Sequence, residues 1–210
     1  MAGTGNTDKD GRGSPGLPNA FTARLLPCPG RNIEPVTSGS LSGAEGVLIT
    51  GVYGSGKSSV AVEIAYLLEE QQRPYALLDL DYLGWGGADF SSHTASYPLM
   101  LRNLAAVAAN YREAGVGTFV VAWFVCDHGA LRSVQEAVGV PLRVVRLTVP
   151  LDGIRQRLAT DPTAGRADDL REAAAQIAAS EGMGVEDLVV ANDRPVAVVT
   201  AEIMSWLGWH

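Results

Sequence analysis

The sequence predicts an α/β fold, a three-layer sandwich in which a five-stranded parallel sheet lies between helices. Short apolar runs alternate with segments of helical period, which is typical of such a sheet. The run from Thr118 to Cys126 is continuously apolar, which indicates a strand covered on both faces. The segment Gly51–Ser58 joins the first apolar run to the first helix and matches G-x-x-x-x-G-K-[ST] at every fixed position.

The individual elements follow from the spacing of apolar residues and from breakers. A short apolar run predicts the first strand at 46–50, and an apolar stripe at helical spacing predicts a helix over 57–72 that Pro74 stops. We read residues 84–96 as a loop and Pro98 as the opening of the next helix. The same criteria predict strands at 75–80, 118–126, 143–149 and 188–191, and helices at 131–138, 151–159, 166–180 and 195–207.

The first 44 residues differ in composition from the rest of the chain. They are rich in Gly, Pro, Ser, Thr and Asn and show no periodicity, so we expect a flexible tail over 1–44 and a folded domain over 45–210. A disordered extension without a role and a partner-binding arm are both open interpretations of this tail.

Charge and cysteine content exclude several classes of protein. The formal net charge is -7 and no dense Lys/Arg cluster occurs, so we expect no nucleic-acid partner and no membrane partner. No apolar run approaches the length of a membrane span, and Cys28 and Cys126 form neither a disulfide framework nor a metal-ligand spacing. A cytoplasmic location is the expectation, and a homodimer is left open.

The glycine-rich motif carries the strongest chemical prediction. Glycines let backbone N–H groups converge on phosphate oxygens, and the following helix adds the positive end of its dipole. We expect Lys57 to reach the β- and γ-phosphates of ATP and the Ser58 hydroxyl to ligate Mg²⁺. The predicted nucleotide-binding residues of this segment are Gly51, Tyr53, Gly54, Ser55, Gly56, Lys57, Ser58 and Ser59.

Two carboxylates close the predicted second strand. Asp79 and Asp81 are two residues apart, so on a strand both side chains would point the same way, toward the phosphate site. One is expected to hold Mg²⁺ and the other to orient or deprotonate an acceptor hydroxyl. A pair of solvated acids at a strand end is the alternative.

A further acid follows the third predicted strand. Asp127 is a candidate Mg²⁺ ligand, but it fits equally well as the cap of the next helix. Both interpretations stay open. We read the neighbouring His128 as a plain loop histidine.

Arginines follow the fourth predicted strand, where phosphoryl transfer would need cations. This segment holds Arg155, Arg157, Arg166 and Arg171, which a loop that closes over the triphosphate could supply, and Arg157 is the expected catalytic cation. A solvated helical face accounts for at least two of the four.

A regulatory GTPase is a rival because residues 81–84 have D-x-x-G spacing. That segment follows the second strand, however, and no N-K-x-D motif occurs later in the chain. A large motor or AAA machine would need a longer chain.

The core, from about residue 46 to 209, resembles the small phosphate-loop kinases that include adenylylsulfate, shikimate and gluconate kinases. The likeness lies in Gly51–Ser58, in Asp79–Asp81, in the strand at 143–149 with its following helix, and in the closing stretch 189–209. The resemblance implies the P-loop NTPase fold with strand order 2-3-1-4-5, a helical lid over about 157–178 and adenine contacts near Arg194 and Pro195. It also implies that Asp79 and Asp81 lie at the magnesium and acceptor site.

The sequence also departs from these kinases. The arginine that accompanies the adenylylsulfate kinase acids is missing, and Cys126-Asp127-His128 stands where shikimate kinase has a glycine triplet. Neither substrate is supported, and the chain looks similar to actinobacterial ATP-binding proteins whose acceptor the resemblance does not imply.

We therefore expect a kinase that moves the γ-phosphate of ATP to a hydroxyl of a small molecule. The aromatic residues Trp85, Phe90, His93 and Tyr97 would wall the acceptor or anchor their loop. An ATP-binding interaction module and a plain nucleotide hydrolase are the alternatives.

Overall fold

The structure is a computed structural model that describes residues 43–85, 93–160, 167–180 and 184–210. The chain divides into two units, residues 1–35 and 36–210, and every described residue lies in the second. The expected tail therefore falls almost wholly outside the described residues, as do Phe90 of the acceptor loop and Arg166 of the lid.

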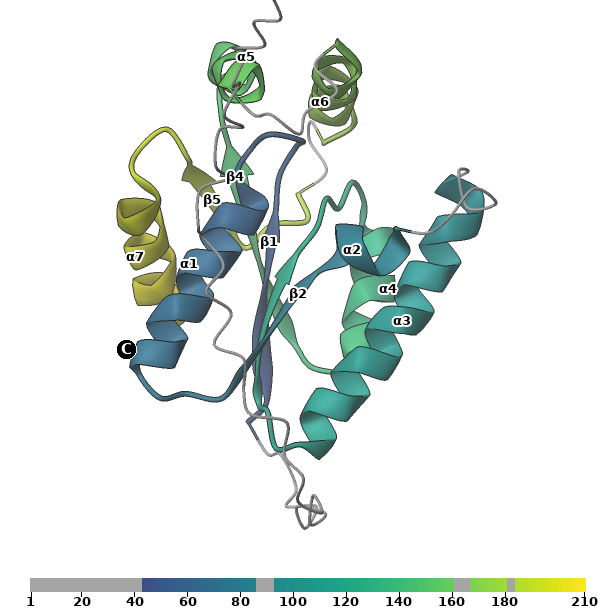
Figure 1. The fold of residues 1–210 in the computed structure, drawn as a ribbon, viewed down its shortest axis with the longest axis vertical. Coiled ribbons are helices and arrows are strands. Elements are labelled where there is room, and N and C mark those ends of the chain that lie inside the picture. Colours follow the sequence, from purple (N-terminus) through teal and green to yellow (C-terminus); the bar gives the residue numbers. More distant parts are fainter. Residues whose placement is uncertain (1–42, 86–92, 161–166, 181–183) are drawn as a thin grey trace, which may run out of the picture. The chain divides into compact units, whose positions relative to one another are not determined.

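Five parallel strands form one sheet in the order β2-β3-β1-β4-β5, which confirms the predicted order. Helices alternate with the strands along the chain (Figure 1). The elements are β1 (Glu45–Thr50), α1 (Lys57–Glu70), β2 (Tyr75–Asp79), α2 (Leu80–Gly84), α3 (His93–Glu113), β3 (Thr118–Ala122), α4 (His128–Val138), β4 (Leu142–Thr148), α5 (Leu151–Thr160), α6 (Ala167–Ser180), β5 (Leu188–Ala191) and α7 (Val196–Leu207).

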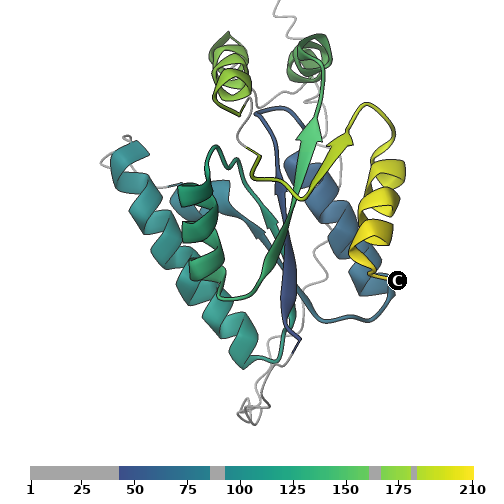
Figure 2. The ribbon, with the colours of Figure 1, turned by 180° about the vertical axis from the view of Figure 1, so that it is seen from behind.

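Helices cover both faces of the sheet because the strand residues on each face are apolar. Along β1, Val47 and Ile49 pack in a core with α1 and α7, whereas Leu48 packs in a second core with α3 and α4. Figures 1 and 2 show these helix pairs on opposite sides of the sheet, with α5 and α6 at the carboxyl ends of the strands. The loops that follow the strands thus gather at one edge, where ligands bind in sheets of this kind.

The element boundaries differ from the prediction at several points, of which four concern the carboxyl end of the sheet or its neighbourhood. Helix α4 begins at His128, three residues early, so His128 is helical and not a loop histidine. β3 ends at Ala122, four residues early, and the N–H of Val125 donates to the Thr50 side chain instead of to a neighbouring strand (2.9 Å). Asp79 caps a short helix, α2, because its side chain accepts from the N–H of Asp81. Helix α3 begins at His93, so Pro98 lies inside it and does not open it.

The amino end of the sheet carries a network of charged and aromatic side chains. The Glu45 carboxylate accepts from Arg73 (2.9 Å), from Arg143 (3.2 Å) and from the indole N–H of Trp209 (2.9 Å). Trp209 is buried, 2% exposed, whereas Trp206 is 36% exposed and stacks against Arg143. This network ties the last residues of the chain to the first strand.

Candidate functional site

The segment Gly51–Ser58 forms a turn between β1 and α1, as the motif predicts. Gly51 and Gly56 have φ angles of 141° and 92°, which side chains other than glycine rarely adopt. A Cβ at Gly51 would lie 2.6 Å from the carbonyl oxygen of Leu147, and one at Gly56 would lie 2.6 Å from Asn192 Nδ2. The loop therefore packs closely against the ends of β4 and β5, and helix α1 begins at this edge of the sheet.

A cavity of about 550 Å³, here called the phosphate cavity, lies beside this loop. The Ser58 hydroxyl donates to Asp79 Oδ2 at 2.7 Å, so the loop is joined directly to the end of β2. The Lys57 ammonium group donates to the Val52 carbonyl (3.3 Å). The cavity is lined by Tyr53, Gly54, Gly56, Lys57, Ser58, Ser59, Asp79, Asp81, Tyr82, Trp85 and Leu158.

The charges in the phosphate cavity perturb one another. Burial lowers the pKa of Lys57, and the carboxylates of Asp81 and Asp79 act in the opposite direction. The carboxyl group of Asp81 is partly withdrawn from water, which raises its pKa. Asp79 adds to that rise and Lys57 opposes it. A carboxylate with a raised pKa is a better proton acceptor, which suits it to general-base chemistry.

Asp127 occupies the N-cap position of α4. Its Oδ1 accepts from the N–H of Ala130 (2.8 Å), and this bond is the largest of the effects that lower its pKa. It is not among the described residues that line the phosphate cavity. This geometry favours the cap of the two interpretations that the sequence left open, because the cap already uses the carboxylate.

Arg157, Arg194 and Asn192 border a further cavity of about 450 Å³, the outer cavity, on another side of the loop. Arg157 lies against the phosphate loop, where Nη1 donates to the carbonyl oxygen of Ser55 (3.1 Å) and Nη2 donates to that of Asn192. Arg194 pairs with Glu202 (2.7 Å). Pro195 precedes α7 at its N-cap position and is not among the described lining residues. Of the two residues predicted to contact adenine, Arg194 therefore lines a cavity beside the loop and Pro195 does not, and the predicted catalytic cation Arg157 contacts the loop directly.

Two residues in contact with the loop were missed from the sequence. The buried side chain of Asn192 donates to the Ser55 carbonyl oxygen (2.7 Å), and the side-chain oxygen of Gln176 accepts from the N–H of Tyr53 (2.6 Å). Asn192 directly follows β5, so the rule that ligand sites follow strands could have flagged it. Nothing in the local pattern of α6 distinguishes Gln176.

The aromatic residues expected on the acceptor side divide into two groups. Trp85 lines the phosphate cavity, and Tyr97 stacks on Trp123 with ring centroids 5.6 Å apart. The residue Phe90 and the side chain of His93 lie outside the described part of the chain. The structure thus brings one predicted aromatic residue to the phosphate site, and it shows a partner for another.

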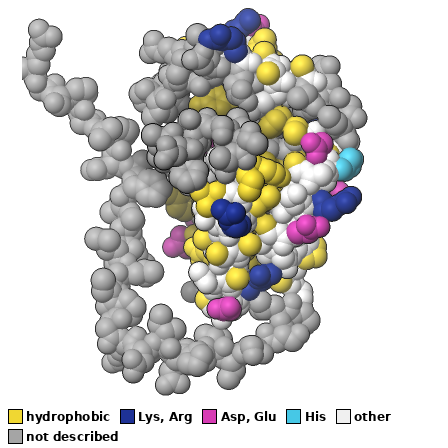
Figure 3. Space-filling model, turned by 90° about the vertical axis from the view of Figure 1, so that its right-hand side faces the viewer, with side chains coloured by type: hydrophobic (Ala, Val, Ile, Leu, Met, Phe, Trp, Pro, Cys, Tyr) yellow, Lys and Arg dark blue, Asp and Glu magenta, His cyan; other side chains and the backbone are white. Residues whose placement is uncertain are grey.

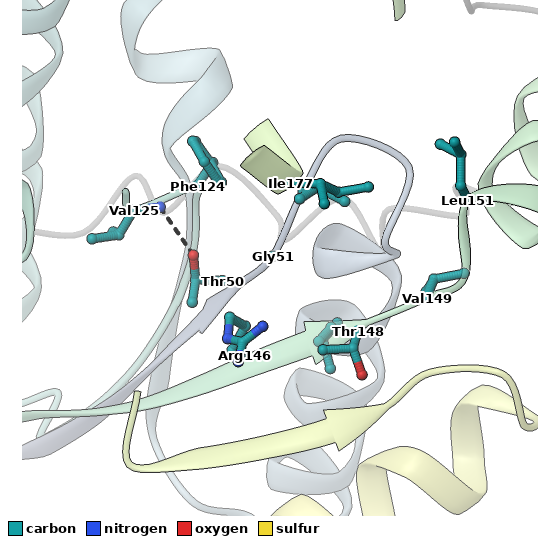
Figure 4. A pocket seen from close by; sticks show the side chains of 11 residues that line it. Thr50, Gly51, Phe124, Val125, Arg146, Thr148, Val149, Leu151 and Ile177 are labelled. Carbon is teal, nitrogen blue, oxygen red and sulfur yellow. Dashed lines mark hydrogen bonds between the residues drawn. The ribbon is translucent and has the colours of Figure 1, made fainter. Parts of the chain in front are cut away.

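A larger cavity of about 570 Å³ lies on the side of the loop where Gly51 and Val52 begin it (Figure 4). Its floor holds Arg146 and Thr50, which are paired across β4 and β1, and Phe124 and Ile177 stand above them. Arg146 pairs with Glu186 at 2.8 Å. Gly51 is the one predicted site residue among its described lining, which is otherwise mainly apolar.

Two surface features bear on partners. In the part of the chain that the structure describes, no helix is long and apolar enough to cross a membrane. On the face shown in Figure 3, the coloured charged side chains of both signs are interspersed with hydrophobic ones and form no basic patch.

Comparisons with known proteins agree with this architecture. A family described as AAA domain matches residues 47–178. None of the curated proteins compared with the sequence matches it.

Solved structures of small kinases share the fold. An APS kinase from Mycobacterium tuberculosis, in complex with AMPPNP and APS, is 27% identical with a TM-score of 0.57, over 79% of this chain and 98% of that one. A gluconokinase from Sinorhizobium meliloti 1021 is 20% identical with a TM-score of 0.55, over 79% and 93%. A shikimate kinase from Aquifex aeolicus is 16% identical with a TM-score of 0.53, over 78% and 96%. The chain belongs to the AAA domain family and has the nucleotide-binding fold of the small P-loop kinases.

Proposed function

We propose that this protein is an ATP-dependent phosphotransferase that moves the γ-phosphate of MgATP to a hydroxyl group of a small molecule. The observation that carries the proposal is the arrangement in the phosphate cavity. Lys57 and Ser58 of the loop share this cavity with two carboxylates. The Asp79 carboxylate accepts a hydrogen bond from Ser58, and the Asp81 carboxylate does not. The fold shared with an APS kinase seen with AMPPNP and APS supports this proposal.

The residues present fit a magnesium ion. The Ser58 hydroxyl and the Asp79 carboxylate lie within 2.7 Å of each other, and both are hard oxygen ligands. Among the described residues, no three His, Cys, Asp or Glu side chains cluster as a metal site. That suits Mg²⁺, which usually takes one or two protein ligands and fills its shell with water and phosphate oxygens. Bound there, Mg²⁺ would neutralise charge on the transferred phosphate.

Each residue then has a role in transfer. The loop N–H groups and Lys57 bind the phosphates and hold the γ-phosphate in line with the acceptor. Asp81 orients the acceptor hydroxyl and accepts its proton while the oxygen attacks phosphorus. The bond from the γ-phosphorus to the bridging oxygen breaks, and its electron pair stays with ADP. No covalent enzyme intermediate is required, because the acceptor is the nucleophile.

We place the adenine ring of ATP in the outer cavity, next to Arg157, Arg194 and Pro195. Arg157 bridges the loop and the segment after β5, so it would also fix the loop in its binding shape. Helices α5 and α6 form part of the proposed lid over 157–178, at the edge where the strands end.

The test measures phosphate transfer from radiolabelled ATP to a mixture of small hydroxyl compounds, together with phosphate release to water. We expect acceptor-dependent labelling that falls about 10²- to 10⁴-fold in Asp81→Asn, the usual range for loss of a general base. Asp187→Asn is the matched control, because Asp187 directly precedes β5, accepts a hydrogen bond from the N–H of Val144 in β4, and is not among the described residues that line the cavity.

Two outcomes would contradict the proposal. Phosphate release that no acceptor stimulates would indicate a plain hydrolase. Tight nucleotide binding with neither transfer nor release would indicate an ATP-binding interaction module.

A further inference from the structure

A smaller cavity of about 310 Å³, here called the aromatic cavity, adjoins the phosphate cavity. Asp81 and Trp85 line both, so a group placed in one would be in reach of the other. Its remaining described lining consists of Leu80, Gly84, Ser96, Tyr97, Met100 and Trp123. A space of this size holds a single ring system, with Asp81 at the side where phosphate would be transferred.

Aromatic rings dominate the walls of this cavity. Tyr97 and Trp123 stack with their planes 15° apart, which presents a flat and rigid surface. Trp85 and Tyr82 form a second stacked pair, with ring centroids 6.1 Å apart, and they are 79% and 70% exposed. Exposed aromatic side chains beside a cavity are typical of a surface that binds a ligand ring, since otherwise they leave apolar area in water.

Positive charge is scarce around these rings. Lys57 is the one cation among the described residues that line the two cavities, and it belongs to the phosphate loop. The sequence has no Lys or Arg from Leu80 to Leu101 or from Trp123 to His128, and these segments include the loop residues beyond the described part. No guanidinium group lines either cavity within the described part of the chain, so a carboxylate or phosphate group on the acceptor would lie beside Asp79 and Asp81 without such a partner there.

A positively charged acceptor fits no better. Asp81 is the only charged residue in the described lining of the aromatic cavity, and it is the group that must accept the hydroxyl proton. A cation beside it would stabilise the ionised carboxylate and make it a weaker base.

We propose that the acceptor is an uncharged alcohol in which a short link joins the hydroxyl group to a planar, largely apolar ring system, and that acidic acceptors are rejected. The ring stacks in the aromatic cavity against Trp85, Tyr97 and Trp123, and the hydroxyl points to Asp81. The neutral alcohol loses its proton to Asp81, its oxygen forms the new bond to the γ-phosphorus, and ADP leaves with the electron pair of the broken bond. This inference rests on the proposed function.

The test compares three probes of nearly the same shape: benzyl alcohol, 4-(hydroxymethyl)benzoate and 4-(hydroxymethyl)benzylamine. Binding to the full chain with magnesium and AMPPNP is measured by ligand-observed NMR. We expect the neutral probe to bind at least tenfold more tightly than the carboxylate, because the carboxylate lacks a cationic partner. Trp85→Ala should weaken the neutral probe about three- to tenfold, as expected for the loss of one aromatic contact.

Two variants sharpen the result. Trp206→Ala is the matched control, because Trp206 is partly exposed and stacks on Arg143 at the opposite end of the sheet. It should leave the affinity of every probe unchanged. Ser96→Arg places a cation in the cavity wall and should raise the affinity of the carboxylate probe relative to the neutral one.

The inference is overturned if the carboxylate probe binds most tightly, if the ammonium probe is phosphorylated faster than the neutral probe in the transfer assay, if none of the probes binds, or if Trp85→Ala has no effect. The failure of AMPPNP itself to bind would instead overturn the proposed function. The same experiment therefore distinguishes a failure of this inference from a failure of the proposed function.

Discussion

At the amino end of the sheet, Glu45 accepts hydrogen bonds from Arg73, Arg143 and Trp209, and both of its carboxylate oxygens take part. At the carboxyl end, the part of the chain that the structure describes shows no such partner for the Asp81 side chain. Its carboxyl group lies near Asp79 and Lys57, which act on its pKa in opposite directions. At the first end these charged groups are hydrogen-bonded to one another, whereas at the second end the structure shows no hydrogen bond to the Asp81 carboxyl group among the described residues. A charged group with a perturbed pKa and no such bond is therefore a better marker of a site than charge alone.

The largest expected effect tests the amino end. Trp209→Ala should lower the free energy of unfolding by about 3 to 5 kcal/mol, because it removes a buried aromatic side chain and its bond to Glu45. Urea unfolding measures the change. Trp206→Ala, at a partly exposed position, should cost under about 1 kcal/mol. Equal effects of the two variants would show that this end is not organised around Trp209.

The next effect tests the carboxyl end. Lys57→Ala should weaken Mg–AMPPNP binding about tenfold or more, because a charged hydrogen bond to phosphate contributes about 1.5 to 3 kcal/mol. Isothermal titration calorimetry gives the affinity. Arg73→Ala is the control from the amino end, and it should reduce stability without changing nucleotide affinity. Unchanged Mg–AMPPNP affinity in Lys57→Ala would contradict the proposal that the phosphate loop binds the nucleotide.

A smaller effect is expected when Glu45 loses its charge. Glu45→Gln should lower the free energy of unfolding by about 0.5 to 1.5 kcal/mol, since its ion pairs are partly exposed and such pairs contribute little each. The fall should shrink at high salt, which screens these pairs. A loss of nucleotide affinity in this variant would contradict the division between the two ends.

The smallest effect concerns pH. The pKa of Asp81 is raised in the folded state, so folding takes up a proton between the ordinary carboxyl value of 3.8 and the raised value. The stability that Asp81 contributes is present below this window and is lost as pH rises through it. Asp81→Asn should therefore be more stable than wild type near about pH 7, with a difference that vanishes toward about pH 4. Thermal unfolding across that range measures it, and a variant less stable at neutral pH would contradict the shift.

The carboxyl end of the sheet could be predicted from the sequence better than the amino end. The loop at Gly51–Ser58 and the strand order were predicted correctly, because the motif is local and the family resemblance supplied the order. The network at Glu45 was not predicted, since Arg73, Arg143 and Trp209 are far apart in the chain and meet only when the sheet forms.

Near the site, the errors also have physical reasons. The prediction placed Asp79 and Asp81 on one strand, but Asp79 caps a helix that begins at Leu80, so the two carboxylates reach the cavity from a strand end and a helix turn. The prediction extended the third strand to Cys126 because its residues stay apolar. In the structure the N–H of Val125 instead donates to the Thr50 hydroxyl oxygen, and the strand has already ended. The pattern of apolar residues does not reveal which backbone group finds a side-chain partner.

The bond between Gln176 and the N–H of Tyr53 has a practical consequence. It makes α6 a reporter of the loop, because any ligand that reshapes the turn shifts the equilibrium of the helix attached to it, and the reverse holds with equal strength. A fluorescent label on α6, or a measurement of its amide hydrogen exchange, would then report whether a ligand occupies the phosphate cavity. Helix α6 itself contributes no residue to the glycine-rich motif.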